Sequence, residues 1–218
     1  MLYFNTLPKI FTPDQNGNYI LLTNILTRAK LIEKLQNNPM LFYKYSIQDG
    51  DTPEILAEKY YDDPFKYWII LYSNQIMDPL WDWPLPYEQF LSYINSKYAG
   101  AAASAGMTPF EYTNTTVQEY QKIVTTVDNY SETTNVQTVS VDFATYSALS
   151  TGEQTFPIYA PGHSGNFVVT SCTVKTTKNL VTIFDYEFNL NESKREIKIM
   201  DSRFSNQMEE QFRTLMSV

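Results

Sequence analysis

Three residues of this chain have side chains that could do chemistry. A glutamate in an apolar pocket can act as the general acid of glycoside hydrolysis, and Glu54 is the candidate for that role. His163, the one histidine, could act as a base, and Cys172, the one cysteine, could supply a reactive thiol. A structural role fits each of the three better. Glu54 falls in the first turn of an expected helix, and His163 lies in a loop-like Pro-Gly-His-Ser-Gly run. Cys172 lies in a strand-like run where a small buried side chain fits. We therefore expect no enzyme activity.

The composition also argues against most ligand classes. One histidine and one cysteine cannot supply the repeated ligands of a zinc site, and no glycine-rich phosphate loop is present. The formal net charge is -8, and no dense block of Lys or Arg follows a phosphate backbone, so nucleic acid is not expected. No apolar run of about 18 residues and no signal-peptide pattern occur. We expect no metal, no cofactor, no small-molecule substrate and no membrane anchor.

The elements that would position these residues begin with an extended N-terminal arm over residues 1–40. Pro8, Pro13 and Gly17 interrupt any long element there. Asn24 could then cap a helix before residues 37–39 end it. The apolar stripe of that helix would consist of Ile25, Leu26, Ala29, Ile32 and Leu35.

A small domain is expected next, over residues 41–98 with a following helix. Residues 42–47 alternate in the period of a half-buried strand, and Gly50 allows a tight turn. Thr52 is the expected N-cap of a first helix, with Pro53 at its first position. The apolar face of that helix would consist of Ile55, Leu56, Ala57, Tyr60 and Tyr61.

A second helix of this domain is expected to start at Asp63 and Pro64 and to end at Asn74. Its apolar face would consist of Phe65, Trp68, Ile69 and Tyr72, and Asn74 suits a left-handed C-terminal position. Two short helices on one strand would leave a shallow groove between the Gly50 loop and the loop of residues 75–79.

Aromatic residues gather in the same region. Fifteen of the 33 Phe, Trp and Tyr residues lie between Phe42 and Tyr98, including every Trp. A domain of about 50 residues has too small an interior for all of them, although a Tyr-rich core would take some. We expect the remaining aromatic side chains to serve as interface anchors.

The rest of the chain divides into an insertion, residues 99–179, and a C-terminal segment, residues 180–218. The small residues 99–106 are typical of a linker or loop, and fourteen Ser and Thr residues from Thr113 to Thr151 favour strand structure. Within the insertion we expect a short helix through Val117, Tyr120 and Val124. Strands are expected at 139–143, 167–174 and 180–184, with a turn at 175–179. The spacing of Phe204, Met208, Phe212 and Leu215 predicts a C-terminal amphipathic helix. The expected fold class is α+β.

The small domain resembles the LysM domain, a βααβ module that commonly binds N-acetylglucosamine polymers. The residues that carry this resemblance are Tyr45, Ile47, Gly50, Asp51, Thr52, Ile55, Ala57, Tyr60, Leu71, Asn74, Ile76 and Pro79. Two features depart from it: Pro53 follows Thr52, and residues 81–86 read Trp-Asp-Trp-Pro-Leu-Pro in place of the closing strand. Pro84 and Pro86 cannot donate hydrogen bonds to a normal sheet ladder.

A wider resemblance is to the baseplate wedge subunit family, gene product 53, of T-even-like contractile-tailed bacteriophages. It is carried by two blocks in the same order, over roughly residues 1–98 and 180–218. The first contains the run Tyr60, Tyr61, Asp62, Asp63 and Pro64, then Tyr67, Trp68, Asn74, Asp78, Pro79, Trp83 and a helical stretch over 90–98. The second is the run from Asn191 to Ile199, which contains Lys194 and Arg195.

This resemblance implies a structural protein of the virion tail baseplate, assembled in the host cytoplasm. Its implied partners are other baseplate wedge proteins: the core helical-bundle subunits and a sheath-initiating, lysozyme-like subunit. The chain would bind neighbouring wedge subunits and link wedges during assembly. The expected partner-binding residues are Tyr60, Tyr61, Trp81, Trp83, Arg195, Ile197, Ile199, Phe204, Met208 and Phe212.

The alternative function is a LysM-type carbohydrate-binding module for peptidoglycan or a chitin-like glycan. Its sugar groove would be formed by Gly50, Asp51, Thr52, Gln75 and Ile76, with sugars stacked on Trp81 or Trp83. The missing closing strand argues against this alternative.

Overall fold

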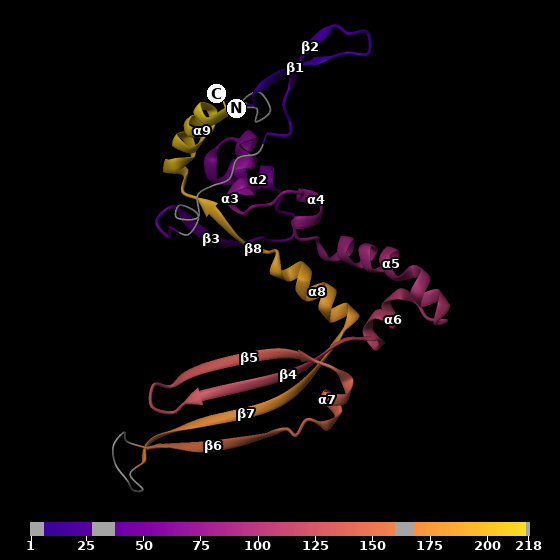
Figure 1. Ribbon diagram of the computed structural model, residues 1–218, viewed down its shortest axis with the longest axis vertical. Coiled ribbons are helices and arrows are strands. Elements are labelled where there is room, and N and C mark those ends of the chain that lie inside the picture. Colours follow the sequence, from indigo (N-terminus) through magenta and orange to yellow (C-terminus); the bar gives the residue numbers. More distant parts are fainter. Residues whose placement is uncertain (1–6, 28–37, 160–167, 217–218) are drawn as a thin grey trace. The chain divides into compact units, whose positions relative to one another are not determined.

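The computed structural model describes residues 7–27, 38–159 and 168–216 (Figure 1). The protein is mixed α+β and divides into two compact units. The first unit combines Met1–Gln89 with Leu190–Val218, and the second is Phe90–Asn189. The first unit is therefore built from two stretches that are far apart in the sequence. The division at residues 40, 98 and 179 stays a prediction.

The N-terminal arm is a β-hairpin of β1 (Lys9–Pro13) and β2 (Tyr19–Thr23). The carboxylate of Asp14 accepts the backbone N–H groups of Asn16 and Asn18 in the turn, both at 2.8 Å. Gly17 has a φ of 80°, which glycine adopts at no steric cost. Most of the helix expected after Asn24 lies outside the described residues; Asn24 itself caps a turn by accepting the N–H of Leu26.

The small sheet of the first unit pairs β3 (Phe42–Ser46) with β8 (Glu196–Met200). The strands are antiparallel, and Tyr45 lies opposite Ile197. The second strand thus comes from the C-terminal block, a source that the sequence did not reveal (Figure 1). Residues 81–86 form no strand, as the two prolines require.

Three helices of the first unit begin with the same local chemistry, a Thr or Asp cap followed by proline. Thr52 accepts the N–H of Ile55 at 3.3 Å and starts α2 (Pro53–Tyr61). Asp63 accepts the N–H of Phe65 at 2.9 Å and starts a 3₁₀ turn, η2 (Pro64–Lys66), which leads into α3 (Tyr67–Ser73). The expected starts of α2 and of the second helix are therefore confirmed. Asp78 caps the short α4 (Pro79–Asp82) in the same way.

The end of α3 differs from the prediction. Asn74 has a φ of -101° and is not left-handed; the left-handed residue is its neighbour Gln75, with a φ of 57°. The order β3, α2, α3, β8 is a strand, two helices and a strand. The closer likeness to a LysM domain stays a proposal.

The core of the first unit lies between α2, α3, the small sheet and α9 (Ser202–Met216). Phe212 and Met216 of α9 are buried in it, and Phe204 and Met208 pack against it. The amphipathic C-terminal helix is therefore confirmed, but Leu215 is exposed because the apolar stripe runs on to Met216. Ile55 and Phe65, which were expected on apolar helix faces, are exposed as well. The buried members of the core are Leu7, Ile47, Leu56, Ala57, Tyr61, Trp68, Ile69, Ile70, Ile197, Ile199, Met200, Phe212 and Met216.

The second unit contains a four-stranded antiparallel sheet in the order β5-β4-β7-β6 (Figure 1). Its strands are β4 (Val117–Asp128), β5 (Thr133–Val141), β6 (Gly152–Tyr159) and β7 (Val168–Thr182). The short helix expected through Val117, Tyr120 and Val124 is wrong, because this stretch is β4. The turn expected at 175–179 is also wrong, because β7 runs through it without a break.

The helices of the second unit are α6 (Pro109–Thr115), α7 (Phe143–Ala148), most of α5 (Tyr87–Ser104) and most of α8 (Ile183–Ser193). The linker expected at 99–106 is wrong, because α5 continues to Ser104. Alanine has the highest helix propensity, so a run of alanines extends a helix that has already begun. The strands expected at 139–143 and 180–184 end early, since Phe143 starts α7 and Ile183 starts α8.

Candidate functional site

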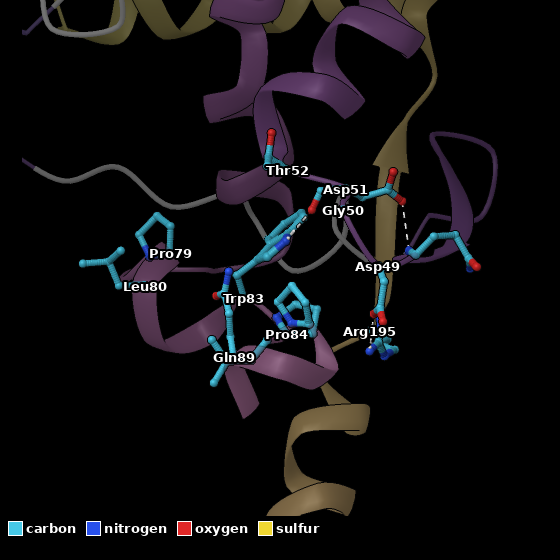
Figure 2. A pocket seen from close by; sticks show the side chains of 13 residues that line it. Asp49, Gly50, Asp51, Thr52, Pro79, Leu80, Trp83, Pro84, Gln89 and Arg195 are labelled. Atoms are coloured by element: carbon cyan, nitrogen blue, oxygen red, sulfur yellow. Dashed lines mark hydrogen bonds and ion pairs between the residues drawn. The ribbon is translucent and has the colours of Figure 1, made fainter. Parts of the chain in front are cut away.

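The first unit has a cleft beside the Gly50 loop, with a volume of about 290 Å³ (Figure 2). Residues 48–52 line one part of it, and Pro79, Leu80 and residues 83–86 line another. Gln89 and Arg195 complete the lining. The cleft is therefore formed by the turn after β3, by α4 and its exit, by the first turn of α5 and by the residue before β8.

The Gly50 loop is fixed by its own hydrogen bonds. Gly50 has a φ of 96°, a conformation that residues with a Cβ rarely adopt. Asp51 Oδ2 accepts the hydroxyl of Tyr45 at 2.7 Å and the N–H of Gln48 at 2.9 Å. The hydrogen bond to Asp51 is the main reason why the pKa of Tyr45 is raised to about 12. Asp51, expected to contact sugar, instead ties the turn to β3.

The segment after α4 is held to the rest of the unit by side chains. The indole Nε1–H of Trp83 donates to the Asp51 carbonyl at 3.0 Å, which is one of the dashed lines in Figure 2. Asn191 accepts the N–H of Leu85 at 2.8 Å and donates to the Leu85 carbonyl at 3.0 Å. An asparagine side chain thus satisfies the backbone between Pro84 and Pro86, where a sheet ladder could not form.

Arg195 links the start of β8 to the Gly50 loop. Its guanidinium donates to Asp49 at 2.7 Å, to the Ile47 carbonyl at 3.0 Å and to both carboxylate oxygens of Glu192 at 2.8 Å. Burial alone would lower the pKa of Arg195, but these carboxylates outweigh that effect and raise it. Because two carboxylates already pair with this cation, the arrangement favours a structural role for Arg195 over recognition of an anion.

The residues considered for chemistry do not meet in this cleft. Glu54 is exposed in the first turn of α2 and does not line the cleft. Cys172 is half-buried in β7, less enclosed than expected, and His163 lies outside the described residues. Among the residues that the structure describes, no group of three or more His, Cys, Asp or Glu could hold a metal ion. None of the described helices has the length and apolar content that crossing a membrane requires.

The expected partner-binding residues do not form one surface. Tyr61, Ile197, Ile199 and Phe212 are buried in the core, so their side chains stabilise the unit itself. Those of Tyr60, Trp83, Phe204 and Met208 are partly buried and pack against that core. Only Trp81 projects well into solvent.

The expected sugar groove is also only partly assembled. Gly50, Asp51 and Thr52 line the cleft together with Trp83, whereas Gln75 and Ile76 do not. Trp81, one of the two tryptophans expected to stack on sugars, does not line it either.

An exposed apolar surface borders the cleft at α4. We call it the α4 surface and define it as the side chains of Met77, Leu80 and Trp81, which are 64%, 80% and 63% exposed. The backbone beneath it is fixed, because Asp82 accepts the N–H groups of both Met77 and Asp78. Sequence reasoning found Trp81 but missed Met77 and Leu80. The cap at Asp78 and Pro79 is the signal that could have placed Leu80 and Trp81 in one short helix, with Met77 just before it.

A comparison with protein families places this chain beside a family of known phage proteins. The model of the family described as base plate wedge protein 53 matches residues 3–135, which is more than half of the 218 residues. The match includes all of β1 to β4 and ends within β5, so it extends into the insertion but leaves out residues 180–218, where a resemblance was also expected. No curated protein matches the chain. The chain belongs to the base plate wedge protein 53 family.

Proposed function

We propose that this chain binds neighbouring wedge proteins and links wedges during assembly of a phage tail baseplate. Membership of a baseplate wedge family carries this proposal, since it makes the chain a structural baseplate protein of a phage tail. The proposed partners are the core helical-bundle subunits and the sheath-initiating, lysozyme-like subunit of the wedge. Assembly would take place in the host cytoplasm.

The α4 surface is the proposed contact site. Tryptophan is enriched among the residues that dominate binding energy at protein interfaces, and such residues lie in contacts that exclude water. Trp81 and Leu80 are exposed on the short helix α4, whose entry is fixed by hydrogen bonds to Asp82, so binding would require little ordering of the backbone. The adjoining cleft, about 290 Å³ in volume, offers room for side chains of a partner.

The test is a binding measurement with the variants Trp81→Ala and Leu80→Ala. The full chain is mixed with each purified wedge protein of the same phage, and complexes are separated by size-exclusion chromatography with light scattering. Each variant should weaken binding by about tenfold or more, as truncation of a central anchor does. Tyr130→Ala, which removes another well-exposed aromatic side chain, is the matched control and should bind normally. If the native chain joins no wedge protein, the proposed function is wrong.

A further inference from the structure

The β1–β2 hairpin carries apolar side chains on both faces. Phe11 pairs with Leu21, while Ile10 pairs with Leu22 on the opposite face, because successive residues of a strand point to opposite sides. Tyr19 joins the first of these faces. The six apolar residues Ile10, Phe11, Tyr19, Ile20, Leu21 and Leu22 are between 43% and 73% exposed. An antiparallel sheet that lies on a surface keeps one polar face toward water, and this hairpin has none.

The hairpin is almost free of charge. Lys9 and Asp14 are the charged residues of residues 9–23, at the start of β1 and in the turn. The carboxylate of Asp14 accepts backbone N–H groups, of which that of Asn18 does most to lower its pKa. A partner surface that covers either face must therefore be apolar and needs no charged side chains to complement the hairpin.

The exposed area is that of a protein interface. Ile25 and Leu26, which follow β2, are even more exposed than most of the hairpin residues. Together these eight side chains expose an area on the order of the ~800 Å² that each partner contributes to a standard interface. An isolated two-stranded hairpin is at best marginally stable in water, so a partner that covers this area would also stabilise the hairpin.

The base of the hairpin is attached to the first unit. Leu7, two residues before β1, is buried in the core. The N–H of Asn24 donates to the Pro8 carbonyl at 2.7 Å and closes the hairpin at its base. The hairpin therefore begins from a fixed point, while its own apolar side chains are exposed.

We infer that this hairpin is an insertion arm that a neighbouring wedge protein encloses on both faces in an uncharged, apolar cleft. A second copy of the chain fits less well, because two hairpins stacked face to face would each leave one apolar face exposed. The inference rests on the proposed function for the class of partner and adds where and how that partner binds.

Two pairs of substitutions test the two faces separately. Phe11→Ser with Leu21→Ser changes one face, and Ile10→Ser with Leu22→Ser changes the other. Gln15→Ser, in the turn, is the control and should bind as the native chain does. Each pair should weaken binding to the purified wedge protein by about tenfold or more. Loss of binding for one pair only would overturn the two-sided cleft.

Hydrogen exchange of the full chain provides the second readout. Amides of β1 and β2 should exchange fast in the chain alone and at least tenfold more slowly after the wedge protein is added. Protection already present in the dilute chain would mean that the hairpin needs no partner to be covered, and protection that rises with chain concentration would mean that a second copy covers it. Either result overturns the inference. If the α4 variants weaken binding and both hairpin pairs bind normally, the inference fails while the proposed function stands.

Discussion

The side-chain amide of Asn74 forms two hydrogen bonds with the backbone of Lys198, a residue 124 positions later in the chain. Its Nδ2–H donates to the Lys198 carbonyl at 2.7 Å, and its Oδ1 accepts the Lys198 N–H at 2.7 Å. Nδ2 also donates to the Ile70 carbonyl at 2.8 Å, which fixes the amide at the end of α3. The side chain thus satisfies the backbone N–H and carbonyl of one residue of β8, as a neighbouring strand would. It joins the two distant parts of the first unit.

Replacing Asn74 by alanine should destabilise the first unit. The change leaves the N–H and carbonyl of Lys198 without their bonds to this amide, at an expected cost of about 1–3 kcal/mol in the free energy of unfolding. Urea denaturation followed by tryptophan fluorescence measures this cost, because Trp68, Trp81 and Trp83 all lie in the first unit. Asn206→Ala, which removes an exposed amide bonded to Lys66, is the control and should change stability by less than about 0.5 kcal/mol. Equal stabilities of the two variants would contradict the role of Asn74.

Ile199 should be among the most sensitive positions of β8. It is fully buried in the core, so Ile199→Ala should reduce the free energy of unfolding by about 2–5 kcal/mol. Ile55→Ala makes the same chemical change at an exposed position of α2 and should cost far less. The same denaturation measurement compares them, and similar costs would argue against β8 as a core strand. A deletion of residues 197–218 would not serve as a test of partner binding, because it would remove part of the core of the first unit.

Acid should weaken the junction of β3 and α9 through Asp201. This carboxylate accepts hydrogen bonds from Arg203 at 2.7 Å and from the Tyr43 hydroxyl at 2.5 Å. Arg203 first, and then Tyr43, hold the pKa of Asp201 well below its usual value. A lowered pKa in the folded state contributes stability above the unfolded-state pKa of about 4, and that stability is lost as the pH falls toward the folded-state value.

The matching experiment measures urea midpoints between pH 7 and pH 2.5. Asp201→Asn should have a lower urea midpoint than the native chain at pH 7. Its midpoint should then fall less than the native midpoint as the pH is lowered. Glu196→Gln, a change at an exposed carboxylate of β8, should follow the native curve. An unchanged pH dependence in Asp201→Asn would show that this carboxylate is not the titrating group.

The second unit depends on a buried carboxylate. Glu187 of α8 accepts hydrogen bonds from Lys97 at 2.6 Å and from Tyr98 at 2.6 Å, both on α5. Burial opposes its ionisation, but these bonds outweigh burial and lower the pKa of Glu187. Lys97→Met should therefore leave the buried carboxylate of Glu187 less well compensated and lower the free energy of unfolding by about 1–3 kcal/mol. The loss should be smaller than for a fully buried pair, because Lys97 is partly exposed.

Thermal unfolding followed by circular dichroism in the far ultraviolet measures the effect of Lys97→Met. Lys175→Met in β7, where the side chain is exposed, is the control and should leave the melting temperature nearly unchanged. A melting temperature of Lys97→Met equal to that of the control would contradict the stabilising role of the pair.

Local chemistry was predictable from the sequence. The starts at Pro53 and Pro64 follow from a cap residue and a proline, both of which act within one turn of helix. The stripe of α9 follows from side-chain spacing in the same way, although its last buried member is Met216 and not Leu215.

What could not be predicted depends on distant pairing. Nothing near Tyr45 indicates that its strand partner is Ile197, because the two strands come from distant parts of the sequence and meet only in the folded protein. The spacing of Val117, Tyr120 and Val124 fits a helix, yet the two flanking strands of the sheet decide the outcome. In the candidate site, the exposure of Met77 and Leu80 likewise depends on how α4 packs.

The most direct test of the whole account is a cryo-EM map of the phage tail baseplate. We expect this chain to lie between wedge proteins, with Trp81 and Leu80 buried against one neighbour and the β1–β2 hairpin enclosed by an apolar cleft. A baseplate without this chain would contradict the proposed function, and one in which the α4 surface faces solvent would contradict the proposed contact site.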